Sequence, residues 1–258
     1  MRVPSLSVAG LPVVAAGLAD ASDLLWGDMR SRTGRVYAFV NAHSSILVRR
    51  SPDYQTVLER DTTVPLVDGS SLAFGARVFG GIDLRRSPGP DFFLQSMARA
   101  EQDGTKFFFI GGAPGVVERL VDKAHESYPD LKVTGVVTPS FGEWTEDELA
   151  GFIESIKTAD PDVIWVGVSA PKQEIWADGV VGRLSRPVVC VGAAFDYLSG
   201  TKPRAPRWVR RLGMEWLHRL LTEPGRLWKR YLVGNTVFMF DLVTKGVRKH
   251  EVHVETER

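Results

Sequence analysis

Polar side chains follow several short apolar runs of this sequence, at the points where those runs end. Asp68 comes directly after one run and before Gly69, and Asn41 and Asp196 follow two others. A single carboxylate in this position is a reasonable general base, able to take a proton from a reacting hydroxyl. The alternative for Asp68 is that it caps a helix beginning near residue 70. Asp196 has a similar standing.

Gly111 and Gly112 follow another apolar run and precede an expected helix. Two glycines there allow a phosphate or a ribose to approach the backbone closely, with amide N–H groups facing the ligand. The alternative is that they only close a tight turn between strand and helix. The chain contains neither the GxGxxG fingerprint nor the P-loop pattern GxxxxGK[ST], so the pair alone does not identify a nucleotide.

Pro171-Lys-Gln-Glu174 begins a further expected helix, which places Gln173 and Glu174 in its first turn. Gln173 is suited to binding a uracil edge or sugar hydroxyls. Glu174 either belongs to the same site or simply complements the positive end of the helix dipole. Lys172 either contacts phosphate or is solvated.

The sequence predicts no metal site. Asp160-Pro-Asp162 has the Asp-x-Asp pattern that holds a metal in many sugar-nucleotide transferases, but it precedes its expected strand and so lies at the opposite edge from the other candidates. The five histidines show no metal-ligand spacing. The single cysteine, Cys190, lies in an apolar run and is expected in the core, and it excludes a disulfide framework within the chain.

The elements that must position these residues alternate between strand and helix. The expected strands are residues 35–41, 63–67, 106–110, 131–137, 162–168 and 187–191, with a first strand near Val13. The expected helices are residues 53–61, 70–80, 91–102, 116–128, 145–157 and 171–184, with another from about Asp20. Asp91 is a plausible N-cap, and Thr145-Glu-Asp-Glu148 forms a capping box.

Short apolar strands joined by helices predict an α/β fold, a Rossmann-like parallel sheet with helices on both faces. In an open parallel sheet, ligands bind beyond the carboxyl ends of the strands. The polar and glycine residues described above are therefore expected to gather at one edge of the sheet.

The charge of the chain is divided unevenly along its length. The 258 residues carry a formal net charge of +1, which excludes a histone-like or wholly acidic protein. Residues 201–258 hold 13 Lys and Arg against 6 Asp and Glu, whereas residues 1–200 hold 19 against 25. We therefore expect a catalytic domain over residues 1–200 and a basic C-terminal helical appendage over residues 201–258, with an anionic partner for the appendage.

The appendage contains an amphipathic helix expected from Pro206 to Leu221, followed by a second segment over residues 226–243. Arginine beside tryptophan on such a helix is typical of a surface that meets anionic lipid, and it also suits capture of a diphosphate. Nucleic acid is disfavoured because no nucleic-acid-binding motif accompanies the arginines. No apolar run approaches the roughly 20 residues of a membrane span. A signal peptide over residues 1–18 is disfavoured by Pro12.

Seven blocks of residues, standing in order, resemble the WecG/TagA/CpsF family of bacterial glycosyltransferases (glycosyltransferase family 26). The Pro171-Lys-Gln-Glu174 and Glu215-Trp-Leu-His-Arg219 blocks are the most specific, and the resemblance covers roughly residues 8–235. The others are Val67-Asp68-Gly69, Arg86-Ser-Pro-Gly-Pro-Asp91, Phe109-Ile-Gly-Gly112, Val191-Gly-Ala-Ala-Phe-Asp196 and Arg204-Ala-Pro206.

The resemblance implies an inverting transferase that moves a sugar from a UDP-sugar to a polyprenyl-diphosphate-linked glycan. It implies a role in cell-surface polysaccharide synthesis, a peripheral position on the cytoplasmic face of the plasma membrane, and no metal or other cofactor. Asp68 matches the catalytic base. The residues expected to bind substrate are Asn41, Arg86, Gly111, Gly112, Gln173, Glu174, Asp196, Arg204, Arg207, Arg211 and Arg219.

One residue departs from the family pattern: Phe39 stands where the family often has a threonine thought to help bind substrate. This departure bears on the contacts to the acceptor or on the donor sugar. The donor stays open among N-acetylmannosamine, its uronic acid, glucose and glucuronate, and the acceptor sugar and a homo-oligomer also stay open. Two other classes compete with the transferase. One is a nucleotide-dependent oxidoreductase, disfavoured by the missing glycine fingerprint. The other is a membrane-surface adaptor that binds a sugar nucleotide without turnover.

Overall fold

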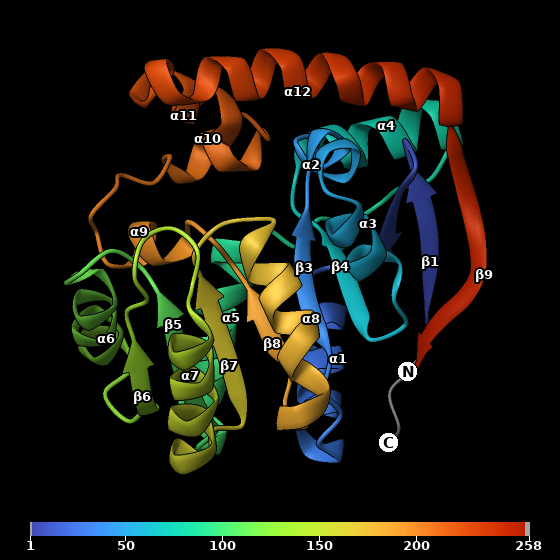
Figure 1. Ribbon diagram of the computed structural model, residues 1–258. Helices are drawn as coiled ribbons and strands as arrows, with labels where there is room; N and C mark the ends of the chain where they lie inside the picture. The colour runs from blue at the N-terminus through green and yellow to red at the C-terminus, as the bar shows by residue number, and fades with distance from the viewer. Residues whose placement is uncertain (1, 256–258) are drawn as a thin grey trace.

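A computed structural model describes the backbone of residues 2–255 and the side chains of residues 3–210, 212–225, 227–229 and 231–249. Over this part of the chain, nine strands form one sheet in the order β6-β5-β7-β8-β3-β4-β2-β1-β9 (Figure 1). The strands are β1 (Arg2–Val8), β2 (Leu11–Val14), β3 (Val36–Val40), β4 (Thr63–Val67), β5 (Lys106–Gly111), β6 (Lys132–Val137), β7 (Val163–Gly167), β8 (Val188–Cys190) and β9 (Val247–Glu255).

Helices cover both faces of the sheet and one of its edges. They are α1 (Leu18–Ser31), α2 (Ser44–Arg50), α3 (Pro52–Glu59), α4 (Ser70–Gly80), α5 (Gly89–Asp103), α6 (Val116–Ser127), α7 (Glu146–Ala159), α8 (Lys172–Leu184), α9 (Ala194–Leu198), α10 (Arg207–Arg211), α11 (Glu215–Thr222) and α12 (Pro224–Lys245).

The predicted α/β sheet is confirmed, and its seven central strands from β6 to β2 are parallel. After β5 the chain moves outward to β6, whereas after β7 it moves inward to β8. The strand order thus reverses between β5 and β7, the kind of point at which open sheets bind ligands.

Alternation along the strands separates two apolar layers. Tyr37 points into the layer beneath α1, α5 and α6, where Trp165 stacks on Phe93 and packs at a tilt against Phe92. Cys190 points into the opposite layer with α7 and α8, which confirms its predicted place in the core. Residues of adjacent positions in a strand face opposite sides, so near-continuous apolar strands are what a doubly covered sheet requires.

The structure corrects the expected elements at both ends of the chain. The N-terminal segment forms the antiparallel hairpin β1–β2 rather than a single strand near Val13. The expected helix from Pro206 to Leu221 is two helices, α10 and α11, because Gly213 takes a left-handed conformation with φ of +71° between them. The chain then ends in β9, which pairs antiparallel with β1 along its length.

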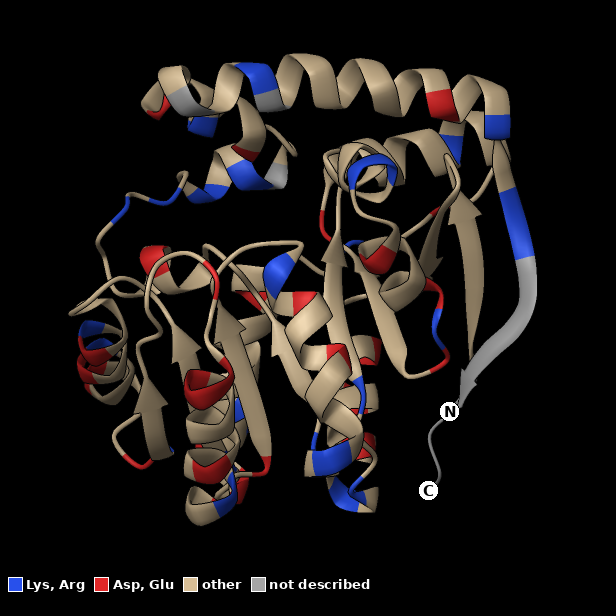
Figure 2. Ribbon diagram, in the orientation of Figure 1, with Lys and Arg blue, Asp and Glu red and all other residues tan. Residues whose placement is uncertain are grey.

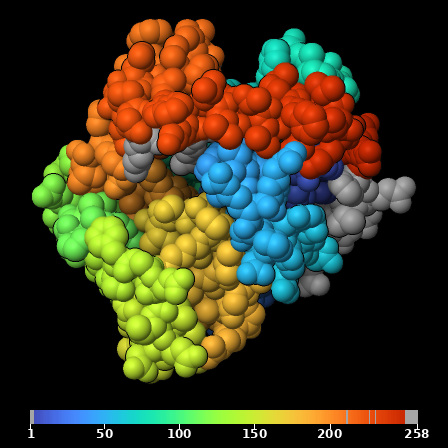
Figure 3. Space-filling model, turned by 45° about the horizontal axis from the view of Figure 1, so that its top comes forward, coloured from blue at the N-terminus to red at the C-terminus, as the bar shows by residue number. Residues whose placement is uncertain are grey.

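The appendage lies across the carboxyl ends of the strands. Figure 1 shows α10 and α11 above the β5–β8 half and α12 running from there to α4, before β9 descends beside β1. In the space-filling view of Figure 3, α12 lies against α2. Figure 2 shows Lys and Arg residues along the linker and α10 on the side that faces the rest of the molecule.

Candidate active site

Asp68 follows β4 at the carboxyl edge of the sheet, where its side chain is half-buried. Its Oδ1 accepts a hydrogen bond from the Gly89 amide at 3.1 Å, and its Oδ2 accepts one from Asn41 Nδ2 at 3.4 Å. Gly69, and not Asp68, is the N-cap of α4, and no side-chain oxygen caps that helix. The capping interpretation is therefore wrong. A carboxylate oriented by two donors and still open to a ligand suits a general base.

Asn41 is oriented toward Asp68 by the start of α2. The Oδ1 atom of Asn41 accepts a hydrogen bond from the His43 backbone amide at 3.0 Å, and the backbone amide of Asn41 donates to Ser44 Oγ at 3.2 Å. With Oδ1 engaged, the Nδ2 group is the one that faces Asp68. A Cβ atom on Gly69 would lie 2.9 Å from Cβ of Asn41, so this glycine permits the close approach of the β3 and β4 ends.

Arg86 comes from the loop between α4 and α5, which Ser87 ties to the body of the protein. The Ser87 amide donates to the Val67 carbonyl at 2.7 Å, and its hydroxyl donates to the Ala16 carbonyl at 2.9 Å. These two bonds to buried backbone fix the position of the loop as it enters α5. Arg86 is thereby held beside the Asp68 edge of the sheet.

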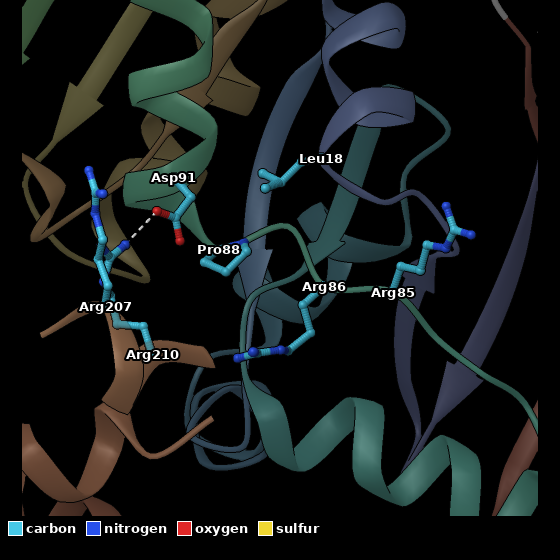
Figure 4. A pocket seen from close by; sticks show the side chains of 7 residues that line it. All are labelled: Leu18, Arg85, Arg86, Pro88, Asp91, Arg207 and Arg210. Carbon is cyan, nitrogen blue, oxygen red and sulfur yellow. Dashed lines mark hydrogen bonds and ion pairs between the residues drawn. The ribbon is translucent and has the colours of Figure 1, made fainter. Parts of the chain in front are cut away.

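A cavity of about 470 Å³ lies between this loop and the appendage. Figure 4 shows Arg86 extending toward the side from which Arg207 and Arg210 enter, while the guanidinium of Arg85 turns the other way. Four arginines against one carboxylate make the lining cationic, and arginine offers the fork geometry that matches phosphate oxygens. The residues that line the cavity are Leu18, Arg85, Arg86, Pro88, Asp91, Arg207 and Arg210.

Two arginines of the appendage meet at one carboxylate. Arg204 Nη2 and Arg210 Nη1 each lie 2.8 Å from Oδ1 of Asp91. Asp91 is not the N-cap of α5, as expected from the sequence, because α5 begins two residues earlier with Pro88 as its N-cap. Arg207 is exposed at the cavity, and the side chain of Arg211 lies outside the described residues.

Arg219, from α11, lies within electrostatic reach of Asp68. Its guanidinium carbon is 5.5 Å from the ring centre of Tyr197. Burial alone would lower the pKa of Arg219, but its neighbours, Tyr231 first and Asp68 among them, raise that pKa above its ordinary value. The pKa of Glu215 is raised by burial, and Asp68 adds to that rise while Arg204 opposes it. The appendage thus brings its charges to the carboxylate at the end of β4.

Gly111 and Gly112 lie at the point where the strand order reverses. Gly111 has φ of +135°, and a Cβ atom there would lie 2.5 Å from the Gly167 carbonyl. The Gly112 amide donates to that same carbonyl at 3.1 Å. The expectation that this amide faces a phosphate is therefore corrected: it already has an acceptor, and the two glycines allow β5 and β7 to end in close contact.

Gln173 and Glu174 form a buried network at the start of α8. Gln173 Nε2 donates to Glu174 Oε1 at 2.8 Å and to the Cys190 carbonyl at 3.1 Å, while its Oε1 accepts from the Gly192 amide at 3.2 Å. Burial raises the pKa of Glu174 to about 7, although the Gln173 bond works in the other direction. Both the nitrogen and the oxygen of the Gln173 side-chain amide are therefore hydrogen-bonded, and the bonds to Cys190 and Gly192 hold the turn after β8.

Asp196 lies in α9, which follows β8, and Phe39 lies in the neighbouring strand β3. Asp196 Oδ2 pairs with Lys202 Nζ at 2.6 Å, which ties the start of the appendage to α9. Phe39 packs on Phe92 with ring centres 5.7 Å apart, and a Cβ atom on Gly89 would lie 3.5 Å from it. An aromatic ring therefore lies next to the turn whose Gly89 amide binds Asp68.

The predicted residues fall into two groups at one edge of the sheet. Asp68 and Asn41 interact directly and Arg86 comes from the loop beside them, whereas Gly111, Gly112, Gln173, Glu174 and Asp196 follow β5, β7 and β8. Sequence reasoning missed Arg210 as a site residue, and it gave Asp91 and Glu215 no role in the site. Both carboxylates lie in blocks that the sequence singled out. The arginine partners of Asp91 are more than 100 residues away, and that of Glu215 lies in the linker before α10, so no local pattern reveals these pairs.

Metal-ligand clusters are absent from the described residues: no group of three or more His, Cys, Asp or Glu side chains is placed to hold an ion. Asp160 ends α7 at the amino edge of the sheet, where it pairs with Lys106 and Arg186. This position confirms the prediction that Asp160-Pro-Asp162 forms a turn between a helix and a strand, at the edge of the sheet opposite to the other candidates.

Comparison of the sequence with known proteins gives a family match and a similar enzyme. The sequence model of the glycosyl transferase WecG/TagA/CpsF family matches residues 6–252. The chain is similar to an N-acetylglucosaminyldiphosphoundecaprenol N-acetyl-beta-D-mannosaminyltransferase from Bacillus subtilis (strain 168). The two are 27% identical over 228 residues, a stretch that covers 88% of this chain and 86% of the relative.

Proposed function

The chain belongs to the WecG/TagA/CpsF glycosyltransferase family, and on that premise we propose that it transfers a sugar from a UDP-sugar to a polyprenyl-diphosphate-linked acceptor. The proposal includes inversion at the anomeric carbon and a place in cell-surface polysaccharide synthesis. The observation that carries it is the half-buried Asp68 carboxylate, oriented by Asn41 and Gly89 beneath a set of appendage arginines.

Asp68 acts as the general base. It takes the proton from the acceptor hydroxyl as that oxygen attacks the anomeric carbon, and UDP leaves from the opposite face. A single displacement of this kind inverts the configuration. The Asn41 and Gly89 hydrogen bonds hold both carboxylate oxygens, so little reorganisation is needed when the proton moves.

Arginines stabilise the diphosphates of the two substrates. Arg86 and Arg207 face the 470 Å³ cavity, and Arg219 lies within electrostatic reach of Asp68. Charge that develops on a leaving diphosphate is stabilised most by donors already in place when the bond breaks. The appendage also covers this edge of the sheet, which limits the access of water to the donor.

The activity in the name of the Bacillus subtilis relative suggests the substrates to test first. UDP-N-acetylmannosamine is the first donor, and undecaprenyl-diphosphate-linked N-acetylglucosamine is the acceptor. Phe39, which lies beside the Asp68 turn, favours an apolar contact with one sugar ring at a place where a threonine would offer a hydroxyl.

A lipid-linked acceptor requires the enzyme to work at a membrane surface, which in this proposal is the cytoplasmic face, and the outer side of the appendage supports a membrane contact. No helix among the described residues is long and apolar enough to cross a bilayer. The adjoining helices α4, α11 and α12 instead expose a broad apolar surface beside basic residues, as interfacial helices do. Its residues are Phe74, Val78, Phe79, Trp216, Leu221, Trp228, Leu232, Val233, Met239, Phe240 and Val243.

Turnover by an Asp68→Asn variant tests the proposal. We expect UDP release in the presence of a short-chain lipid acceptor to fall about 10²- to 10⁴-fold, because the variant cannot take the proton. Asp61→Asn, which alters an exposed carboxylate, serves as the control and should keep native turnover. Native rates in Asp68→Asn with an intact fold would contradict the assignment, and a product that retains the donor's anomeric configuration would contradict inversion.

A vesicle assay tests the membrane contact separately. Leu232→Glu and Phe240→Glu should reduce co-sedimentation with vesicles that contain phosphatidylglycerol, because each places a charge on the apolar surface. Glu118→Gln on α6, on the exposed side of a helix away from that surface, should bind vesicles like the native protein. Equal sedimentation of all these proteins would contradict the membrane contact.

A further inference from the structure

Among the described residues that line the arginine-rich cavity, Asp91 is the one carboxylate, and it already holds two of the appendage's guanidinium groups. We propose that Asp91 is a positioning residue: it acts as a clasp that holds Arg204 and Arg210, and with them α10, closed over the Asp68 edge of the sheet. The role in the reaction rests on the proposed function, whereas the clasp itself rests on geometry alone.

The two ion pairs of the clasp are short and partly shielded from water. Both guanidinium nitrogens lie 2.8 Å from the same Asp91 oxygen, and the side chains of Arg204, Arg210 and Asp91 are 13%, 21% and 28% exposed. Ion pairs in a partly buried place are screened less by water and salt than isolated surface pairs are. Arg210 also donates a hydrogen bond in this pair.

The clasp joins segments that are far apart in the chain. Asp91 lies in the first turn of α5, whereas Arg204 comes from the linker and Arg210 from α10. A carboxylate in the first turn of a helix is favoured by the helix dipole, which suits the position of Asp91. Local capping does not use it, since Pro88 is the N-cap of α5, so Asp91 is available to the appendage.

The same turn holds the catalytic carboxylate. The Gly89 amide, two residues before Asp91, donates to Asp68 Oδ1. Closure of α10 and orientation of Asp68 are therefore set by one rigid turn at the start of α5. The clasp holds Arg210 at the lining of the cavity, so a phosphate group meets a preformed site and less arginine side-chain entropy is lost on binding.

Other polar contacts of α10 and α11 act in support of the clasp. Ser70 Oγ donates to the Gly213 carbonyl at 3.0 Å, at the break between α10 and α11. Arg204 Nε also lies 3.9 Å from Glu215 Oε1, which extends the charge network from the linker to α11. Asp91 is the member of this network that belongs to the body of the protein and binds two appendage residues at once.

Hydrogen exchange of the full-length protein without substrates tests the clasp. In Asp91→Asn we expect amides of residues 204–222 to exchange about tenfold faster, because a charge-assisted contact is lost. Exchange over β5 and β7 should stay slow, and it reports in the same experiment that the fold is intact. Asp91→Glu keeps the charge and should exchange like the native protein. Asp23→Asn removes an exposed pair of equal length, Arg99 to Asp23 at 2.8 Å, and is the matched control.

Calorimetric binding of inorganic pyrophosphate is the second readout. Asp91→Asn should bind it about tenfold more weakly, since Arg204 and Arg210 are no longer held in place. Unchanged exchange over residues 204–222, exchange as fast in Asp91→Glu as in Asp91→Asn, or unchanged or tighter pyrophosphate binding would each overturn the clasp. Neither measurement needs turnover, so a failure of the proposed transferase reaction would leave both results readable.

Discussion

The two ends of the appendage are attached to the body by different physical means. At the α12 end, Phe238 and Leu242 are buried in the apolar layer with Leu72 and Ala76 of α4, and β9 pairs with β1 in the sheet. At the α10 end, Val209 is buried, but the direct contacts to the body include the Asp91 ion pairs and the Ser70 hydrogen bond.

This difference indicates which end can respond to a substrate. Burial of apolar side chains involves no charge that salt can screen, so we expect the α12 end to stay attached. Ion pairs between partly exposed groups are weakened by salt and contribute less than apolar burial does. We therefore expect α10 and α11 to be the part of the appendage that opens and closes, with α12 and β9 as the fixed base.

The largest expected effect is at the fixed end. Phe238→Ala should lower the free energy of unfolding by about 3–5 kcal/mol, because it leaves a cavity between α12 and α4. Phe240→Ala, two residues away on the outer face and 62% exposed in the native protein, should change it by less than about 0.5 kcal/mol. Urea denaturation measures both. Equal effects would mean that the packing of α12 against the body contributes little.

A pH titration provides a reference that belongs to neither end. Burial raises the pKa of Glu174 to about 7, so the folded state binds its proton more tightly than the unfolded chain does. Stability is then lost as pH rises from about 4.5 to about 7, by up to about 3 kcal/mol, and levels off above that range. Glu174→Gln should remove this loss in denaturation measured across pH. A native-like pH dependence in the variant would assign the effect to another group.

A smaller effect is expected from the buried charge of α12. Asp241 is 1% exposed, and its Oδ1 lies 2.6 Å from Arg49 Nη2 and 3.0 Å from Lys245 Nζ. Asp241→Asn should cost about 1–2 kcal/mol, less than for a fully buried pair, because both cations can still reach water. Thermal unfolding measures the change, with Asp23→Asn as the exposed control. A stabilised variant would show that α12 is held by apolar packing alone.

The smallest effect separates the two ends without a mutation. Raising the salt concentration from about 0.1 M to about 1 M shortens the screening length from about 10 Å to about 3 Å. Amides of residues 207–222 should then exchange about two- to fivefold faster, whereas those of residues 236–245 should change little. Hydrogen exchange at the two concentrations measures this. The same response at both ends would remove the distinction between them.

Much of the fold is predictable because local patterns carry it. The strands at residues 63–67 and 106–111 are runs of apolar residues covered on both faces. Such strands can be recognised from their own residues, without knowing which strands lie beside them. The capping box at Thr145 and Glu148 is likewise local and is confirmed. The β1–β9 pairing was missed because its partners stand at opposite ends of the chain, and neither strand has a strong pattern of its own.

In the candidate site, too, some residues are recognisable from the local sequence and others only from the packed structure. Asp68 is recognisable from its place after an apolar strand and before a glycine, and its neighbourhood with Asn41 follows from the shared strand edge. The roles of Gln173 and the Gly112 amide could not be read in this way, because both depend on which backbone groups already bind them. Hydrogen-bond occupancy is a property of the packed structure.

By itself, the sequence determined the parallel α/β sheet, the edge at which the polar residues gather, the basic character of residues 201–258 and the resemblance to a transferase family. These depend on periodicity, charge and short motifs, which are local in the chain. Only the tertiary structure decided that Arg204 and Arg210 meet at Asp91 and that the last strand returns to the first. Such contacts depend on the path of the whole chain, because the energy of each pair is gained only after every intervening element has folded.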